Sequence, residues 1–227
     1  MIVLKRSFQG KVSMDVIIDN KDIRIERLEL GSWATNAYII VCPRTGKSAL
    51  VDVPAGATTI VKNLKGTELH IMLLTHNHID HIGGLKATRN RVFAPLAIHN
   101  TDNQKWLPFL PEILLKNGDV IQVGEVKIKA IHTPGHTPGS MCFQVGGVLL
   151  AGDTIFPGGP GRTVSPDDFR QIVKSITEII RMLPDETKVY PGHGDSTILK
   201  KEKDELAIFS SRLHSSSLCG DVTWLGT

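Results

Sequence analysis

Four side chains that bind metal ions well fall within six consecutive residues of this sequence. They are His76, His78, Asp80 and His81, and they follow an aliphatic run, residues 69–75, that predicts a buried strand. Imidazole nitrogens and carboxylate oxygens are the usual ligands of zinc and similar transition metals. A loop at the end of a strand can curl so that all four face one place, whereas a strand or a helix cannot. The alternative is a histidine-rich surface loop that binds no metal, but such a loop has no need of four potential ligands in six residues. The segment therefore predicts a metal site, and the number of ligands indicates two ions rather than one.

Two further histidines lie in turns of the same composition. Pro-Gly-His occurs twice, ending at His136 and at His193. The repetition indicates similar turns that lead into one site. His132, four residues before His136, is expected to have a structural role or to support a ligand. Asp52, at the end of an apolar run, and Asp195, two residues after His193, could orient a ligand histidine.

A mixture of short strands and helices must position these side chains. Apolar or alternating runs bounded by Gly, Pro and Asn predict strands over 23–30, 37–41, 49–53, 69–75, 92–94, 97–99, 120–123, 126–132, 141–145, 148–151 and 188–190. Helical periodicity and end signals predict helices over 58–64, 84–90, 167–183 and 199–213. Ser165 followed by Pro166 suits the start of the third helix. Because no low-complexity linker divides the chain, we expect one layered α/β (or α+β) domain over residues 1–227, in which 199–227 form a C-terminal helix and tail.

The segment THNHIDHIGG resembles the THxHxDH signature of the metallo-β-lactamase superfamily. TPGHTPGS, LLAGDTIF and YPGHGDST, which contain His136, Asp153 and His193, are similar to the downstream motifs of that superfamily. The resemblance extends from about residue 28 to about residue 197. It implies a four-layer αββα sandwich with the metal site at one edge, between two sheets.

Carried over residue by residue, the resemblance implies seven ligands for two divalent metal ions. The ligands expected for the first ion are His76, His78 and His136, and those for the second are Asp80, His81 and His193. Asp153 is expected to bridge the two ions, since a carboxylate can give one oxygen to each. The expected metal is zinc, with iron or manganese as alternatives, because these ligands accept all three.

Two cations that share one water would lower its pKa from about 15.7 to roughly 7 or below, which supplies hydroxide at neutral pH. Such a hydroxide attacks a carbonyl that one metal polarises, and both metals stabilise the developing oxyanion. Asp80 is expected to act in catalysis by orienting the hydroxide or handling its proton. The sequence shows no serine in a GxSxG setting. These features together predict a metal-dependent hydrolase.

AGDTIF followed by PGGPGRT is similar to the AGDxLF…GxGR segment of the hydroxyacylglutathione hydrolase (glyoxalase II) group. The resemblance implies hydrolysis of a thioester such as S-lactoylglutathione. In the eukaryotic enzymes of that group a lysine and, two residues later, a tyrosine contact glutathione, whereas this chain has Arg162 and Val164 there. Arg162 can still offer a cation to a substrate carboxylate.

Other activities of the superfamily stay open at this point. Gly161-Arg162-Thr163 is shared with the persulfide dioxygenase branch, an oxidoreductase with one iron. Quorum-quenching lactonases have a tyrosine where this chain has Phe156, but hydrolysis of lactones or other esters remains an alternative. The main class of zinc β-lactamases has a cysteine at the position of Asp153. A binding protein that has lost catalysis would lack ligands, and all seven are present.

The overall composition is that of an ordinary soluble protein. The chain of 227 residues is 41% hydrophobic and 22% charged, with a net charge of +3. Its basic residues are scattered, so we expect no nucleic-acid partner. No stretch approaches the ~20 apolar residues that span a bilayer, and residues 1–15 lack the apolar core of a signal peptide. The three cysteines form no CxxC pair, as in proteins with reduced thiols. We therefore expect a cytoplasmic protein that acts on a small molecule, and the sequence leaves its oligomeric state open.

Overall fold

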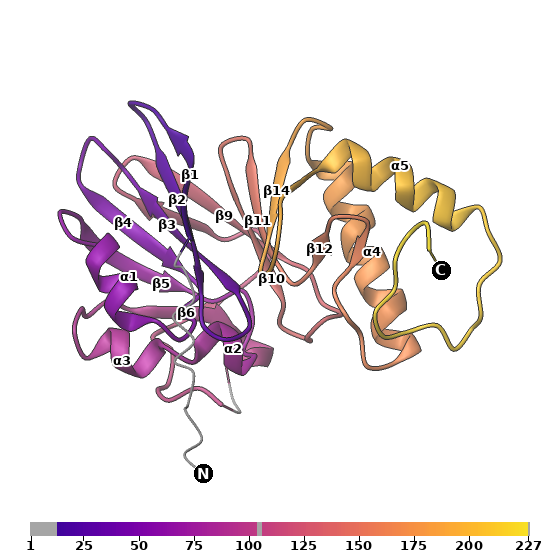
Figure 1. Ribbon diagram of the computed structural model, residues 1–227, viewed down its shortest axis with the longest axis horizontal. Helices are drawn as coiled ribbons and strands as arrows, with labels where there is room; N and C mark the ends of the chain where they lie inside the picture. Colours follow the sequence, from indigo (N-terminus) through magenta and orange to yellow (C-terminus); the bar gives the residue numbers. More distant parts are fainter. Residues whose placement is uncertain (1–12, 104–105, 227) are drawn as a thin grey trace, which may run out of the picture.

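The computed structural model describes residues 13–103 and 106–226, and its strands form two large sheets (Figure 1). The first sheet has seven strands in the order β1-β2-β3-β4-β5-β6-β7. These strands are β1 (Ser13–Asp19), β2 (Arg24–Leu30), β3 (Thr35–Val41), β4 (Lys47–Val51), β5 (Glu68–Leu73), β6 (Leu96–His99) and β7 (Ile113–Leu115). The strands from β1 to β4 pair antiparallel and those from β4 to β7 pair parallel.

The second sheet has six strands in the order β15-β14-β11-β10-β9-β8. Its strands are β8 (Val120–Val123), β9 (Val126–His132), β10 (Met141–Val145), β11 (Val148–Gly152), β14 (Lys188–Pro191) and β15 (Thr197–Ile198). β8 to β11 form an antiparallel meander, and β14 pairs parallel with β11. A separate two-stranded ribbon joins β12 (Ile155–Phe156) to β13 (Gly159–Pro160).

Helices cover the outer faces of both sheets (Figure 1). The helices are α1 (Ala57–Asn63), α2 (Ile79–Ile82), α3 (Leu85–Arg89), α4 (Pro166–Met182) and α5 (Leu199–Ser210), and a short 3-10 helix spans Asn100–Asp102. α1 and α3 lie beside the first sheet, whereas α4 and α5 lie beside the second.

Three apolar clusters separate the layers, and alternating side chains of the strands supply them. In β4, Ala49 and Val51 face the cluster between the two sheets, and Leu50 faces the cluster that contains Ile60 of α1. A third cluster lies between the second sheet and the helices α4 and α5, where Ile172 is fully buried. This order of layers confirms the predicted αββα sandwich.

α4 follows its predicted boundaries closely because the sequence contains clear signals for both its start and its apolar face. The Ser165 hydroxyl accepts a hydrogen bond from the backbone N–H of Asp168 at 3.2 Å, and Pro166 occupies the first helical position. Phe169, Ile172, Ile176 and Ile179 recur at spacings of three and four residues, and all are buried.

Some predicted elements differ from the structure. No strand covers residues 92–94, since β6 begins at Leu96. The helix predicted over 199–213 ends at Ser210. The strands β1, β7, β12, β13 and β15 were not predicted, and four of these five have only two or three residues. Residues 1–12, which carry most of the segment searched for a signal peptide, lie outside the described residues.

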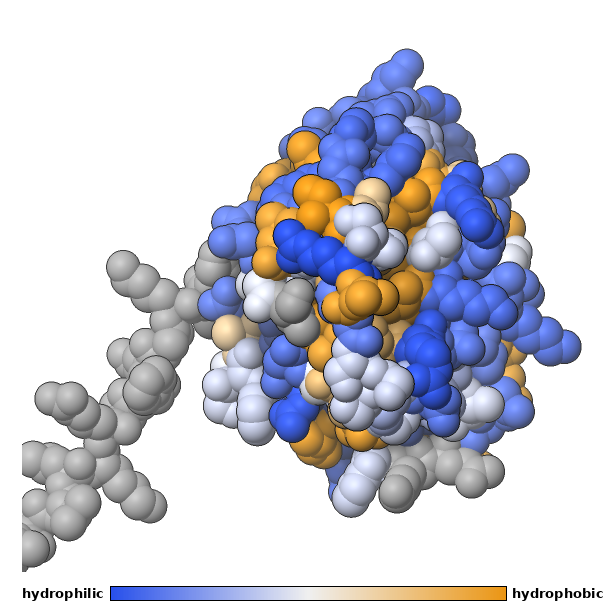
Figure 2. Space-filling view, turned by 90° about the vertical axis from the view of Figure 1, so that its right-hand side faces the viewer, coloured by the Kyte–Doolittle hydropathy of each residue, from blue (hydrophilic) through white to orange (hydrophobic). Residues whose placement is uncertain are grey.

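The face formed by α4, α5 and residues 211–226 has hydrophobic surface near its middle, bordered by hydrophilic surface (Figure 2). Exposed apolar side chains on these segments include Met182, Ile208, Leu213 and Leu225. None of the helices in the described part of the chain is both long and apolar enough to cross a membrane.

Candidate metal centre

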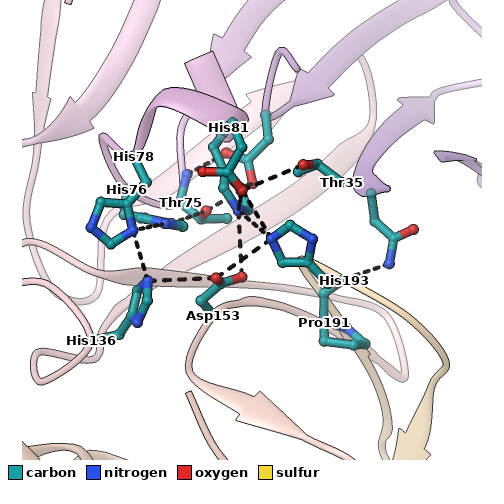
Figure 3. A network of polar contacts seen from close by, with 12 residues as sticks. Thr35, Thr75, His76, His78, His81, His136, Asp153, Pro191 and His193 are labelled. Atoms are coloured by element: carbon teal, nitrogen blue, oxygen red, sulfur yellow. Dashed lines mark hydrogen bonds and ion pairs between the residues drawn. The ribbon is translucent and has the colours of Figure 1, made fainter. Parts of the chain in front are cut away.

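The seven predicted ligands come from five segments that meet at one edge of the two sheets (Figure 3). His76 and His78 follow β5, and His136 lies between β9 and β10. Asp153 directly follows β11, and His193 follows β14. The prediction that one loop carries all four residues of the His76–His81 segment is wrong in part. Asp80 and His81 lie in the short helix α2, and His78 is the residue that precedes it. The turn of this helix separates the pair His76 and His78 from the pair Asp80 and His81.

Three histidine nitrogens form the first group of donors. The Nδ1 atom of His78 lies 3.0 Å from Nε2 of His76 and 2.9 Å from Nε2 of His136. A tetrahedral zinc ion with bonds of about 2.0–2.1 Å separates its ligand atoms by roughly 3.3–3.4 Å. The observed spacing is close to that value, so the three nitrogens could hold one metal ion.

The second group combines two histidine nitrogens with a carboxylate. Nε2 of His193 lies 3.0 Å from Oδ2 of Asp80 and 3.3 Å from Nε2 of His81. The distance between Oδ2 of Asp80 and Nε2 of His81 is 3.5 Å. These three atoms also have the separation expected of ligands around one ion.

The carboxylate of Asp153 lies between the two groups. Its Oδ2 is 3.5 Å from Nε2 of His136 in the first group, and its Oδ1 is 3.4 Å from Nε2 of His81 in the second. Oδ1 is buried and has no hydrogen-bond partner among the described residues. A buried carboxylate oxygen without a donor is costly unless a cation neutralises it. The donor set, together with an oxygen that lacks a hydrogen-bond partner, therefore fits divalent cations.

Asp52 and Thr75 determine which ring nitrogen two of the histidines expose. The Thr75 hydroxyl donates to Oδ2 of Asp52 at 2.8 Å, so its oxygen accepts from Nδ1 of His76 at 3.0 Å. Nδ1 of His81 donates to the same carboxylate at 2.8 Å. Both rings are thereby held in the tautomer that leaves Nε2 free for a metal. Asp52 is 1% exposed and has a positive φ of 58°, a conformation that is uncommon for aspartate.

We expect Asp52→Asn to lower the affinity for metal about 10- to 100-fold, because it removes the anion that orients and polarises His81. Metal titration of the purified variant and the wild type would measure this effect. Asp119→Asn is the control. The Asp119 carboxylate accepts a hydrogen bond from the backbone N–H of Lys116, but it lies outside the site. An unchanged affinity in Asp52→Asn would contradict the orienting role.

Backbone carbonyls orient the other two histidines that offer Nε2. Nδ1 of His136 donates to the carbonyl of Arg162 at 2.8 Å, and Nδ1 of His193 donates to the carbonyl of Trp33 at 3.0 Å. Trp33, rather than the candidate Asp195, therefore orients His193. His132 lies outside the site. Its ring stacks on that of His99, with 3.9 Å between the ring centroids.

β3 holds the segment around His193 against the first sheet. The side-chain amide of Asn36 donates to the carbonyls of Pro191 at 3.0 Å and Gly194 at 3.1 Å, and Tyr38 donates to the same Pro191 carbonyl. The Thr35 hydroxyl lies 3.5 Å from Oδ2 of Asp80. Sequence reasoning missed these residues, because nothing in their local pattern distinguishes them from other strand residues.

The electrostatics of the centre favour ionised carboxylates. Burial alone would raise the pKa of Asp80, but its hydrogen bond with His193 and the charge of His81 lower it to about 2. Burial alone would lower the pKa of His81, but the carboxylates of Asp52 and Asp153 raise it to about 10. Burial and the neighbouring histidines lower the pKa of His76 well below its usual value.

The centre opens into a pocket with a volume of about 790 Å³. The pocket is lined by Trp33, His78, Ile79, Asp80, Trp106, His136, Asp153, Arg162, His193 and Asp221. Arg162, the predicted substrate contact, thus lies in the same pocket as five of the predicted ligands. A small molecule in this pocket would reach both groups of donors.

Comparison with known proteins agrees with this geometry. The family model of the metallo-beta-lactamase superfamily matches residues 30–193, and the chain belongs to that superfamily. The probable hydroxyacylglutathione hydrolase glo2 of Schizosaccharomyces pombe is 32% identical over 172 residues, which cover 72% of this chain and 65% of that protein. The hydroxyacylglutathione hydrolase of Polaromonas sp. is 33% identical over 175 residues, which cover 74% of this chain and 66% of that protein. The chain thus spans about two thirds of the length of these two relatives.

A solved structure, that of the BLEG-1 B3 metallo-beta-lactamase, superimposes with a TM-score of 0.72 at 28% identity. The match covers 79% of this chain and 96% of that chain. The fold, the family and the clustering of the predicted ligands therefore agree with one another.

Proposed function

We propose that this chain is a dinuclear metal-dependent hydrolase that cleaves thioesters of a small thiol, S-lactoylglutathione being the leading candidate. The observation that carries the proposal is the position of Asp153 between the two groups of donors. Its Oδ2 lies 3.5 Å from Nε2 of His136 and 3.7 Å from Nε2 of His193, and its Oδ1 lies 3.4 Å from Nε2 of His81. The similarity to two proteins named hydroxyacylglutathione hydrolase supports the substrate class.

The seven residues would hold two divalent cations, with His76, His78 and His136 on one, Asp80, His81 and His193 on the other, and Asp153 shared. When bound, the cations would supply Lewis-acid activation of water and of the thioester carbonyl. The protein itself fixes the tautomers of His76, His81, His136 and His193 through Asp52, Thr75 and two carbonyls. This arrangement removes the need to reorganise the donors during the reaction.

Asp80 is the residue that we propose to orient the attacking water. It lines the pocket, and its Oδ2 lies 3.0 Å from Nε2 of His193. A pKa of about 2 keeps this carboxylate ionised at neutral pH. It can therefore accept a hydrogen bond from the nucleophile, but it is too weak a base to store the proton.

The test is an activity screen of purified protein whose metal content has been measured. The panel contains S-lactoylglutathione, other thioesters, lactones, nitrocefin and glutathione persulfide. We expect about two metal ions per chain and the highest kcat/KM on the glutathione thioester. Strong turnover of nitrocefin alone would overturn the proposed substrate, and the resemblance to a B3 metallo-beta-lactamase makes that arm necessary. A single iron with oxygen consumption on the persulfide would favour the dioxygenase alternative.

Binding of metal should release protons at pH 8. In protein freed of metal, His81 has a pKa of about 10 and so carries a proton at this pH. It must lose that proton to offer Nε2 to a metal, so we expect release of about one proton or more per chain. Calorimetric titration with Zn²⁺ in buffers of different ionisation enthalpy measures the number. Asp52→Asn should release fewer protons, because Asp52 is one of the groups that raise this pKa. A binding heat that does not depend on the buffer would contradict the assignment.

A further inference from the structure

The C-terminal tail, residues 218–224, lies along the glycine-rich turn that precedes α4. Thr163 and Gly220 exchange two backbone hydrogen bonds, of 3.2 Å and 3.0 Å. This pairing places Asp221 in the pocket of the metal centre, beside Arg162. The same two residues also line a smaller adjoining hollow with His136 and Asp153. An acidic side chain from the end of the chain therefore lies next to the predicted ligands.

Two buried groups anchor the tail, which curves back from α5 past α4 (Figure 1). The backbone N–H of Trp224 donates to the carbonyl of Gly158 at 2.8 Å, and its indole N–H donates to the buried carboxylate of Glu202 at 3.2 Å. Glu202 also accepts a hydrogen bond from the hydroxyl of Thr197 at 2.7 Å. Trp224 is fully buried, so the tail has a defined position. The position of Asp221 is accordingly a feature of the fold.

Arg162 and Asp221 present opposite charges side by side in the pocket. Nε of Arg162 lies 3.8 Å from Oδ2 of Asp221, and the side chains are 71% and 81% exposed. Such an exposed pair contributes little to stability. Both groups instead keep most of their hydrogen-bonding capacity for a ligand, and a neighbouring cation and anion complement a zwitterion.

We propose that Asp221 and Arg162 form a subsite for an α-amino acid group on the thiol part of the substrate, such as the γ-glutamyl end of glutathione. Asp221 accepts hydrogen bonds from the ammonium, and Arg162 donates to the carboxylate. The inference rests on the proposed function, because it concerns the thiol that a thioester hydrolase would release. It extends that function to a stated chemical feature of the substrate, and it assigns a role to the tail.

Ligand binding tests the subsite without turnover. The probes are S-methylglutathione, in which the thiol is blocked, and its N-acetyl derivative, in which the amine is blocked as well. Both are titrated into metal-loaded protein by calorimetry. We expect the free amine to improve the Kd about five- to tenfold, as for one charged hydrogen-bonded contact near the surface. Asp221→Asn should abolish the preference for the free amine. Arg162→Gln should weaken both probes and leave that preference in place.

Asp167→Asn is the matched control, because Asp167 is an exposed acid paired with Arg170 and does not line the pocket. It should bind both probes as the wild type does. Equal affinity of the wild type for the two probes, or a preference that survives in Asp221→Asn, would overturn the subsite.

Turnover of S-lactoyl-N-acetylcysteamine, a thioester without an amino acid group, separates the two proposals. If it is hydrolysed as fast as S-lactoylglutathione and the probes bind equally, the hydrolase stands and the subsite is wrong. If no thioester is hydrolysed but the wild type prefers the free amine and Asp221→Asn does not, the subsite stands and the proposed reaction is wrong.

Discussion

Asp153→Ala should lower kcat/KM about a thousandfold or more and remove most of the bound metal. Its two oxygens lie 3.4 Å and 3.5 Å from histidine nitrogens of different groups, so the substitution takes a ligand from both. Loss of several kcal/mol of charge stabilisation corresponds to rate losses of this size. Elemental analysis of the purified variant, together with steady-state kinetics on the best substrate of the screen, measures both effects.

His193→Ala is the comparison that makes this result specific. His193 belongs to the second group of donors, and its Nε2 faces Asp80 and His81. We expect this variant to retain about one metal ion per chain, held by the three histidines of the first group. If Asp153→Ala also retains one ion at the wild-type affinity, Asp153 serves a single ion and the shared carboxylate is wrong.

The sequence identified the candidate ligands that the structure brings together, because their local spacing carries most of the information. His76, His78 and Asp80 lie close enough in the chain that their residue types alone indicate a metal site. Their division between two groups was expected from the resemblance, and the structure adds the short helix α2, which carries Asp80 and His81. A helix of four residues is too short to leave a periodic pattern in the sequence. The prediction of a loop was wrong for Asp80 and His81 for that reason.

The residues that support the ligands were harder to find, because their roles depend on contacts across the fold. Asp52 was recognised as a candidate from its place at the end of an apolar run. Asn36 was not recognised, although its side chain donates a hydrogen bond to a carbonyl more than 150 positions away in the sequence. Asp221 was missed as well, since only the pairing of Gly220 with Thr163 shows that the tail lies at the pocket. Long-range pairing of this kind leaves no periodic signal in a single sequence.

The short strands were missed for a related reason. β12, β13 and β15 have two residues each. Alternation cannot be detected over two residues, so such strands form where tertiary packing brings two backbones together. The long elements with strong periodicity, such as α4 and β9, were predicted to within one residue at either end.

Gly192→Ala should disrupt the metal centre while the rest of the fold persists. A Cβ atom at this position would lie 2.1 Å from Oδ1 of Asp153 and 2.6 Å from Cε1 of His81. Both atoms belong to predicted ligands, so at least one of them must move away from its position. Displacement of about 1 Å can cost a hundredfold in rate, and here a shared ligand is displaced. We expect loss of at least about one metal ion per chain and a fall in kcat/KM of about a hundredfold or more.

Two other glycines separate this effect from a general loss of stability. Gly147→Ala introduces a Cβ with nothing within 4 Å, so metal content and activity should be unchanged. Gly135, in the other Pro-Gly-His turn, has a φ of +140°. In Gly135→Ala the added Cβ atom would lie 2.5 Å from the backbone nitrogen of Ile172 in α4. This variant should lower the melting temperature, because the strain falls on the packing of α4. Gly192→Ala should instead keep a cooperative thermal transition and lose metal. If it binds metal as the wild type does, the close approach of Gly192 to Asp153 has no part in shaping the centre.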